Sequence, residues 1–140
     1  MRDAVGPTLD QRRARHAWEA VARVKAKDTT TLGSSYSREA KRLPVRILTA
    51  GLGHALAFLY AKASSQAESA NTLLLRDIAD WVLDKRRRSD SGTDRPSADA
   101  LIDEIVKGDG NFLRITTEEV LAYLQWLTRF AEAEFKDDKN

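Results

Sequence analysis

Apolar residues recur three and four positions apart along most of this chain, and this spacing constrains the fold more than any other feature. In residues 9–27 the recurring residues are Ala14, Ala17, Trp18, Val21 and Val24. No segment alternates apolar and polar residues convincingly as a half-buried strand does. The length of 140 residues suits one domain. The sequence therefore predicts an all-α fold, a single-domain bundle of about six helices over residues 1–140.

Capping residues and helix breakers place the first boundaries. Thr8 or Asp10 is expected to cap the first helix, and Ser34 or Ser35 to start the second after a loop at 28–35. The apolar face of the second helix comprises Tyr36, Ala40, Leu43, Ile47 and Leu48. Pro44 has no N–H and disfavours helix in the preceding residue, so we expect a kink or an interruption near Leu43.

Four more helices are expected beyond this point. The third follows Gly51 and the fourth covers about 68–87. After a mobile loop at 86–96, Ser97 is expected to cap a fifth helix that stops at Gly108. Thr116-x-x-Glu119 has the pattern of a capping box and is expected to open the last helix. The ends, 1–8 and 136–140, are expected to fray.

The stretch LPVRILTAGLGHALAFLYAK (43–62) combines a proline, two glycines and a nearly all-apolar end. Its apolar run is shorter than the roughly 20 residues of a bilayer span. Gly51 is expected to end a helix in a left-handed conformation, and Gly53 to allow a close helix approach. A helix-turn-helix would also use such a turn, but its second helix must offer polar side chains to DNA. We interpret this stretch as a buried helix corner.

Charge is distributed unevenly. Residues 1–46 hold eleven Lys/Arg and five Asp/Glu, a net charge of +6. Two basic rows are expected there to contact nucleic-acid phosphates without reading bases: Arg38, Arg42 and Arg46 with Lys41 on the second helix, and Arg12 and Arg15 on the first. The alternative is a solvated face that binds nothing.

The carboxy-terminal part is acidic. Residues 97–140 hold five Lys/Arg and ten Asp/Glu, a net charge of −5. Glu118, Glu132 and Glu134 would repel phosphates, and we expect them to face the basic third of an adjacent copy of the chain.

The sequence contains few residues of the types that catalyse reactions or bind metal ions. The chain has no cysteine, and neither His16 nor His54 has a carboxylate or second histidine at ligand spacing. We therefore predict no catalytic residue, no metal and no cofactor. The absence of a secretory pattern predicts a cytoplasmic protein without membrane attachment. The aromatic residues at helix-periodic positions are expected in the core, leaving few to stack on bases: Trp18, Phe58, Trp81, Tyr123 and Phe130.

Several of these segments also resemble a known family. QRRARHAWEAV (11–21), LPVRILTAGLGHALAFLYAK (43–62), ADWVL (79–83) and GDGNFLRITTEEVLAYLQWLTRFAEAEF (108–135) are similar to the small helical subunit of the Cmr complex, the type III-B CRISPR effector. Ala50 and His54 stand where several members have asparagine and glutamine. The pattern of Gly51, Gly53, Ala57 and Phe58 is kept.

The resemblance implies a non-enzymatic subunit in antiviral defence. Copies would line up beside the backbone subunits that hold the guide RNA, help form the channel for the target RNA and dock other Cmr subunits. Cleavage would belong to the backbone subunits. A purely structural spacer without RNA contact is the alternative.

Overall fold

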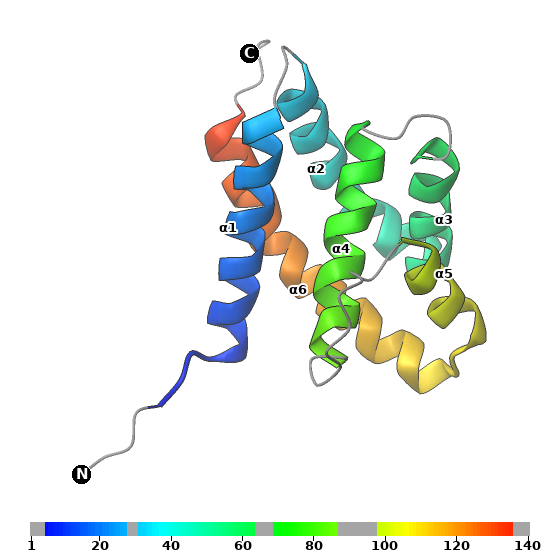
Figure 1. Ribbon diagram of the computed structural model, residues 1–140. Helices are drawn as coiled ribbons and strands as arrows, with labels where there is room; N and C mark the ends of the chain where they lie inside the picture. Colours follow the sequence, from blue (N-terminus) through cyan, green and yellow to red (C-terminus); the bar gives the residue numbers. More distant parts are fainter. Residues whose placement is uncertain (1–4, 28–30, 64–68, 87–97, 136–140) are drawn as a thin grey trace.

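The computed structural model describes residues 5–27, 31–63, 69–86 and 98–135 (Figure 1). This part of the chain forms six helices and no strand: α1 (Leu9–Lys27), α2 (Leu32–Ala50), α3 (Leu52–Ala63), α4 (Ala70–Arg86), α5 (Ala98–Lys107) and α6 (Gly110–Glu134). The predicted all-α fold is confirmed. The loop expected at 86–96 lies, apart from Arg86, outside the described residues, as do 136–140 and the first four of 1–8.

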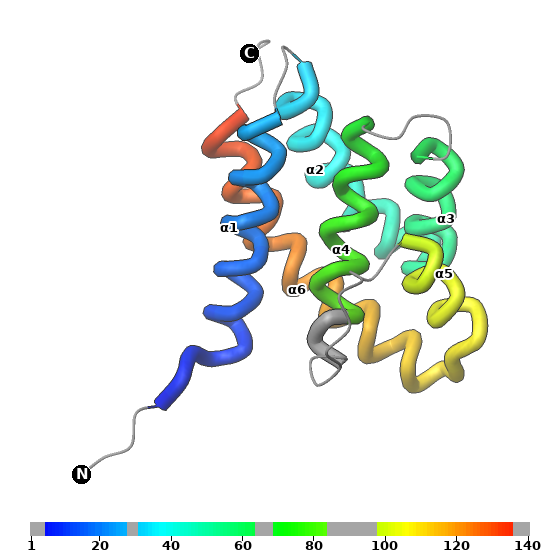
Figure 2. Tube along the Cα trace, viewed as in Figure 1, coloured from blue at the N-terminus to red at the C-terminus, as the bar shows by residue number. Residues whose placement is uncertain are grey.

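Helix α6, of 25 residues, organises the bundle. It begins beside α5, crosses the molecule and ends against α1 (Figures 1 and 2). α1 and α6 run in the same direction, since Arg13 pairs with Glu119 and Lys25 with Glu134. α2 packs against α6, α3 and α4, and α5 packs against α3 and α4. Among the helices described, none is long and apolar enough to cross a bilayer.

One core fills the space between these helices. Its largest fully buried side chains include Tyr36, Leu43, Leu56, Leu74 and Tyr123. Three residues expected in the core are instead exposed: Trp18 by 54%, Leu48 by 73% and Phe58 by 40%. Each lies at the margin of an apolar stripe, where helical spacing does not separate a buried position from a boundary position.

The start of α1 is fixed by a reciprocal pair of hydrogen bonds. The Gln11 N–H donates to Thr8 Oγ1 at 3.0 Å, and the Thr8 N–H donates to Gln11 Oε1 at 2.8 Å. This arrangement is a capping box, so Thr8 is the cap rather than Asp10. α2 begins at Leu32, two to three residues before the serines expected to start it.

Helix α2 continues without a break through Pro44, so the expected interruption near Leu43 is wrong. Leu43 is fully buried and Ile47 is 3% exposed, which anchors the helix in the core on both sides of the proline. Tertiary packing of these two residues overrides the local preference that proline imposes.

The two glycines between α2 and α3 have different roles. Gly51 has φ 94° and ψ 158°, a combination that is essentially restricted to glycine. Its N–H donates to the Ile47 carbonyl at 2.8 Å and ends α2. A Cβ at Gly53 would lie 3.7 Å from Ile105 Cγ2, which is ordinary contact, so the close approach expected there is not present.

Helix α6 begins six residues earlier than predicted. Asp109 caps it by accepting a hydrogen bond from the Phe112 N–H at 2.8 Å. Thr116 and Glu119 lie inside the helix, so the predicted capping box is wrong. The Glu119 carboxylate instead accepts hydrogen bonds from Arg13 of α1 and from Trp81 of α4, at 2.7–2.8 Å.

Candidate nucleic-acid interface

The basic row of α2 consists of Arg38, Arg42 and Arg46, with Lys41 beside it. Residues four apart lie one turn above each other, so the three arginines follow one side of the helix. Their exposure decreases along the row: Arg38 is exposed, the Arg42 side chain is 56% exposed and the Arg46 side chain is 28% exposed. The row is therefore most open at its amino-terminal end.

Glu39 lies within this row and shares its carboxylate between two arginines. Its oxygens are 3.6 Å from Arg42 Nη1 and 3.6 Å from Arg46 Nη1. The Arg46 guanidinium also lies 4.2 Å from the centre of the Phe58 ring, a cation–π arrangement. Arg46 Nη1 and Glu39 Oε1 are buried without a hydrogen bond among the described residues. Arg46 therefore belongs largely to the fold.

Arg38 lines a polar pocket of about 350 Å³ between the starts of α2 and α4. The pocket is also lined by the hydroxyl residues Thr31, Ser35 and Ser69 and by Asn71. Arg38 forms no ion pair with any residue that the structure describes. Helix starts present unpaired N–H groups and a positive dipole end, so they favour anions. Glu39 forms part of the same wall and opposes an anion there.

Sequence reasoning found Arg38 but missed its companions. Thr31 and Ser35 precede it by less than two helical turns, whereas Ser69 and Asn71 are more than 30 positions away. Only the packing of α2 against α4 brings the two groups together. The hydroxyl of Ser69 accepts a hydrogen bond from the Thr72 N–H at 3.2 Å, which fixes its place at the start of α4.

The remaining predicted basic residues differ in whether their charged groups pair with carboxylates of the same chain. Arg12 is exposed and forms no ion pair with the described residues. Arg15 Nε lies 3.2 Å from Glu19, and Lys41 Nζ lies 3.6 Å from Glu132. Arg13, next to Arg12, turns inward to Glu119. Arg12 and Arg38 are thus the cations of the predicted set that are exposed and share their charge with no carboxylate of the described residues.

The three acidic residues predicted to face an adjacent copy already pair within the chain. Glu134 lies 2.9 Å from Lys25, Glu132 lies 3.6 Å from Lys41 and Glu118 lies 3.6 Å from Arg114. The basic third does meet the acidic third, but at Lys25 and Lys41 this happens inside one molecule. The side chains of Glu118 and Glu132 remain at least half exposed.

A carboxylate, an imidazole and a hydroxyl form a chain between α4, α1 and α6. Asp80 Oδ2 lies 2.8 Å from His16 Nε2, and His16 Nδ1 lies 2.7 Å from the Tyr123 hydroxyl. The order matches an acid–base–nucleophile relay. However, Tyr123 is fully buried, and burial raises the pKa of its hydroxyl well above the usual value. A hydroxyl that is both buried and reluctant to ionise is a structural hydrogen-bonding group, not a nucleophile.

The described residues contain no group of three or more His, Cys, Asp or Glu side chains that could hold a metal ion. The described residues do offer exposed basic side chains, Arg12 and Arg15 on α1 and Arg38, Lys41 and Arg42 on α2.

Comparison with known proteins points to one family. The profile of the family described as CRISPR-associated protein (Cas_Cmr5) matches residues 9–134, nearly the whole chain. The fold is similar to the X-ray crystal structure of a CRISPR-associated Cmr5 family protein from Thermus thermophilus, with a TM-score of 0.68 and 30% sequence identity. That match covers 91% of this chain and 97% of the Thermus chain.

Proposed function

This chain belongs to the Cmr5 family of CRISPR-associated proteins, and we propose that it is a non-catalytic small subunit that lines the target-strand channel of the Cmr effector. In this role it contacts the phosphate backbone of guide RNA and target RNA without reading sequence. It also docks other Cmr subunits and further copies of itself. Sequence is read elsewhere, because phosphate contacts fix register and orientation but carry no base information.

The observation that carries this proposal is the pocket at Arg38. An open arginine, three hydroxyl residues and two helix starts surround a space large enough for a phosphate group. Arg42 continues the row one turn further along α2, and Arg12 adds an open cation on α1. Arg15, Lys41 and Arg46 also belong to the proposed surface, but they share their charge with Glu19, Glu132 and Glu39.

The acidic residues of α6 have the complementary role in this proposal. Glu118, Glu132 and Glu134 face protein neighbours, since carboxylates repel the RNA backbone. Glu118 is the most available of the three because its side chain is 70% exposed, whereas that of Glu134 is 29% exposed.

A structural spacer without RNA contact is the second candidate. It is favoured by the pairing of Arg42 and Arg46 with Glu39, which lowers the charge available to phosphates. A helix-turn-helix DNA-binding role is disfavoured. Leu52, Leu56 and Leu59 of α3 are buried, so much of the helix that would have to read DNA belongs to the core.

Reconstitution of the Cmr effector with and without this chain tests the proposal. We expect omission to weaken the binding of target RNA, about equally for all target sequences paired with matching guides. Cleavage of the RNA that is still bound should continue, because the proposed role is non-catalytic. Equal binding of target RNA in both assemblies would favour the spacer. Loss of cleavage on changing a single Asp or Glu of this chain, with RNA still bound, would contradict the non-catalytic role.

A further inference from the structure

Helix α5 buries fewer side chains than any other helix of the bundle. Of its ten residues, all described, Leu101 alone is buried, whereas α3, of 12 residues, buries four. Ile102 and Ile105 pack against the core but are only partly buried, and Val106 is 74% exposed. An element with few buried apolar contacts opens at a lower free energy than the core around it.

The contacts of α5 are directed to two neighbouring helices, α3 and α4. Ile105 lies beside α3, since a Cβ at Gly53 would be 3.7 Å from its Cγ2. The Tyr60 hydroxyl of α3 donates a 2.7 Å hydrogen bond to Asp99 at the exposed start of α5. Breaking these contacts leaves the packing of α1 against α6, and of α2 against α6, in place.

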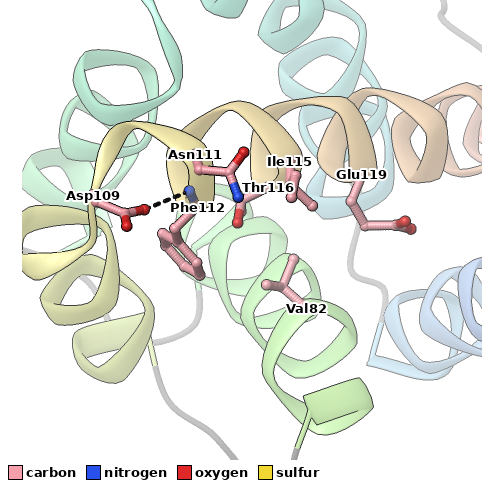
Figure 3. A pocket seen from close by; sticks show the side chains of 7 residues that line it. All are labelled: Val82, Asp109, Asn111, Phe112, Ile115, Thr116 and Glu119. Carbon is pink, nitrogen blue, oxygen red and sulfur yellow. Dashed lines mark hydrogen bonds between the residues drawn. The ribbon is translucent and has the colours of Figure 1, made fainter.

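The junction of α5 with α6 is loosely packed. Only Gly108 and Asp109 separate the two helices, and a Cβ at Gly108 would clash with the Phe112 ring. Phe112 borders two hollows, one of about 370 Å³ beside α5 and one of about 390 Å³ toward Val82 of α4. Figure 3 shows Phe112 and Val82 directed toward the second hollow, with Asp109 at one end. Close packing resists motion, and this junction lacks it.

A helix as short as α5 depends on its docking. Isolated helices of fewer than about 12 residues are marginal in water. The ion pair between Asp103 and Lys107, at 3.1 Å, is exposed and adds little. Undocking therefore melts α5 and frees its backbone N–H groups to exchange with solvent.

We propose that α5 is a strap that opens about Gly108 and Asp109 while the other five helices stay packed. In the closed state Leu101 and Ile105 cover one side of α3 and α4. The open state uncovers that side, so the strap controls access to an apolar surface that the closed protein does not present. The inference does not depend on RNA binding.

Hydrogen exchange of the isolated protein, under conditions in which reclosing is faster than exchange, tests the strap. The hydrogen-bonded amides of α5 should exchange with one common free energy, at least about tenfold faster than the interior amides of α4. Low concentrations of urea should speed exchange in α4 and barely change it in α5, because opening of the strap exposes little surface.

A variant far from α5 separates local opening from global unfolding. Val24 of α1 is 2% exposed, and α1 packs against α2, α4 and α6. Val24→Ala should speed exchange of the interior amides of α4 about tenfold, because they exchange through global unfolding. It should leave α5 unchanged, because the contacts of Val24 persist when the strap opens.

Two variants act on the strap itself. Leu101→Ala should speed exchange in α5 about thirtyfold or more, with the remaining helices still folded. Tyr60→Phe removes the bond to Asp99 and should speed it about threefold. Equal acceleration of α4 and α5 in Val24→Ala, or equal urea dependence of the two helices, would show that α5 opens only with the whole bundle and would overturn the inference. Failure of Leu101→Ala to fold would have the same meaning.

Discussion

The Thr128 hydroxyl of α6 donates a 3.4 Å hydrogen bond to the Ala40 carbonyl of α2. Ala40 is the residue whose carbonyl would accept the N–H of residue 44, and residue 44 is a proline. The Thr128 side chain of α6 thus donates to a carbonyl of α2 that receives no backbone hydrogen bond from Pro44. α2 remains helical through Pro44 in the presence of this contact.

Removal of that hydroxyl should destabilise the protein. Thr128→Val keeps the shape but leaves the Ala40 carbonyl without this donor, at a cost of about 1 kcal/mol because the bond is long. Thr128→Ser should cost less. In a Pro44→Ala background the restored N–H can donate to Ala40, so Thr128→Val should cost less there than in wild type. Urea unfolding of the four variants checks this, and equal costs in both backgrounds would contradict it.

Two adjacent arginines of α1 should differ greatly in their effect on stability. Arg13 donates to Glu119 from Nε at 2.7 Å and from Nη2 at 2.8 Å, and the two side chains are 17% and 13% exposed. Arg13→Met leaves a mostly buried carboxylate without its cation and should cost about 3 kcal/mol. The matched change Arg12→Met, at an exposed position, should stay within about 0.5 kcal/mol. Thermal unfolding of both variants measures the difference, and similar losses would refute the assignment.

Asp77 should make the protein more stable at mildly acidic pH. Burial raises its pKa from 3.8 to about 6, although Arg23 and the hydrogen bond from Tyr36 at 2.6 Å act in the opposite direction. The folded state therefore binds this proton more tightly than the unfolded state. The contribution is complete below about pH 4 and is lost as the pH rises through about 6.

Asp77→Asn isolates this effect, because the amide stays neutral and its oxygen can still accept from Tyr36. The variant should gain stability relative to wild type between about pH 4 and pH 7, by roughly 1–3 kcal/mol. Urea unfolding at a series of pH values gives the difference directly. A difference that does not change with pH would show that Asp77 is not held protonated by the fold.

The two glycines of the α2–α3 corner should respond differently to alanine. Gly51→Ala forces a side chain into a backbone conformation with φ 94° and should cost roughly 1–3 kcal/mol. Gly53→Ala adds a Cβ in ordinary contact with Ile105 inside a helix and should be neutral or stabilising by up to about 1 kcal/mol. Differential scanning calorimetry separates the two outcomes. A larger loss at Gly53 than at Gly51 would reverse this interpretation.

The fold class could be predicted because helical spacing is repeated over the whole chain, so errors at single residues do not change it. The residues at which the helices begin were harder to predict from the sequence. Thr116 and Glu119 have the residue types of a capping box, but Glu119 is used by Arg13, over 100 positions away. Asp109, the true cap, lies seven residues before the predicted cap, Thr116.

The candidate site was predictable only in part, for a similar reason. Spacing of four places Arg38, Arg42 and Arg46 in one row, but it cannot show that Glu39 and Phe58 close one end of that row. Periodicity also assigned Trp18 to the core. The exposure of Arg46 and the exposure of Trp18 both depend on which side chains of other helices lie beside them. Helical spacing within one segment carries no information on those neighbours.

The central claim is that the surface around Arg38 meets RNA phosphates, and the salt dependence of target-RNA binding by the assembled effector tests it most directly. Arg38→Ala combined with Arg42→Ala should weaken binding for all target sequences. It should also reduce the slope of log affinity against log salt by about 0.7 for each lost phosphate contact. Arg76→Ala, a change of an exposed α4 arginine outside the proposed surface, should leave the slope unchanged. A slope in the double variant equal to that of wild type would contradict the claim and assign these arginines to the protein spacer.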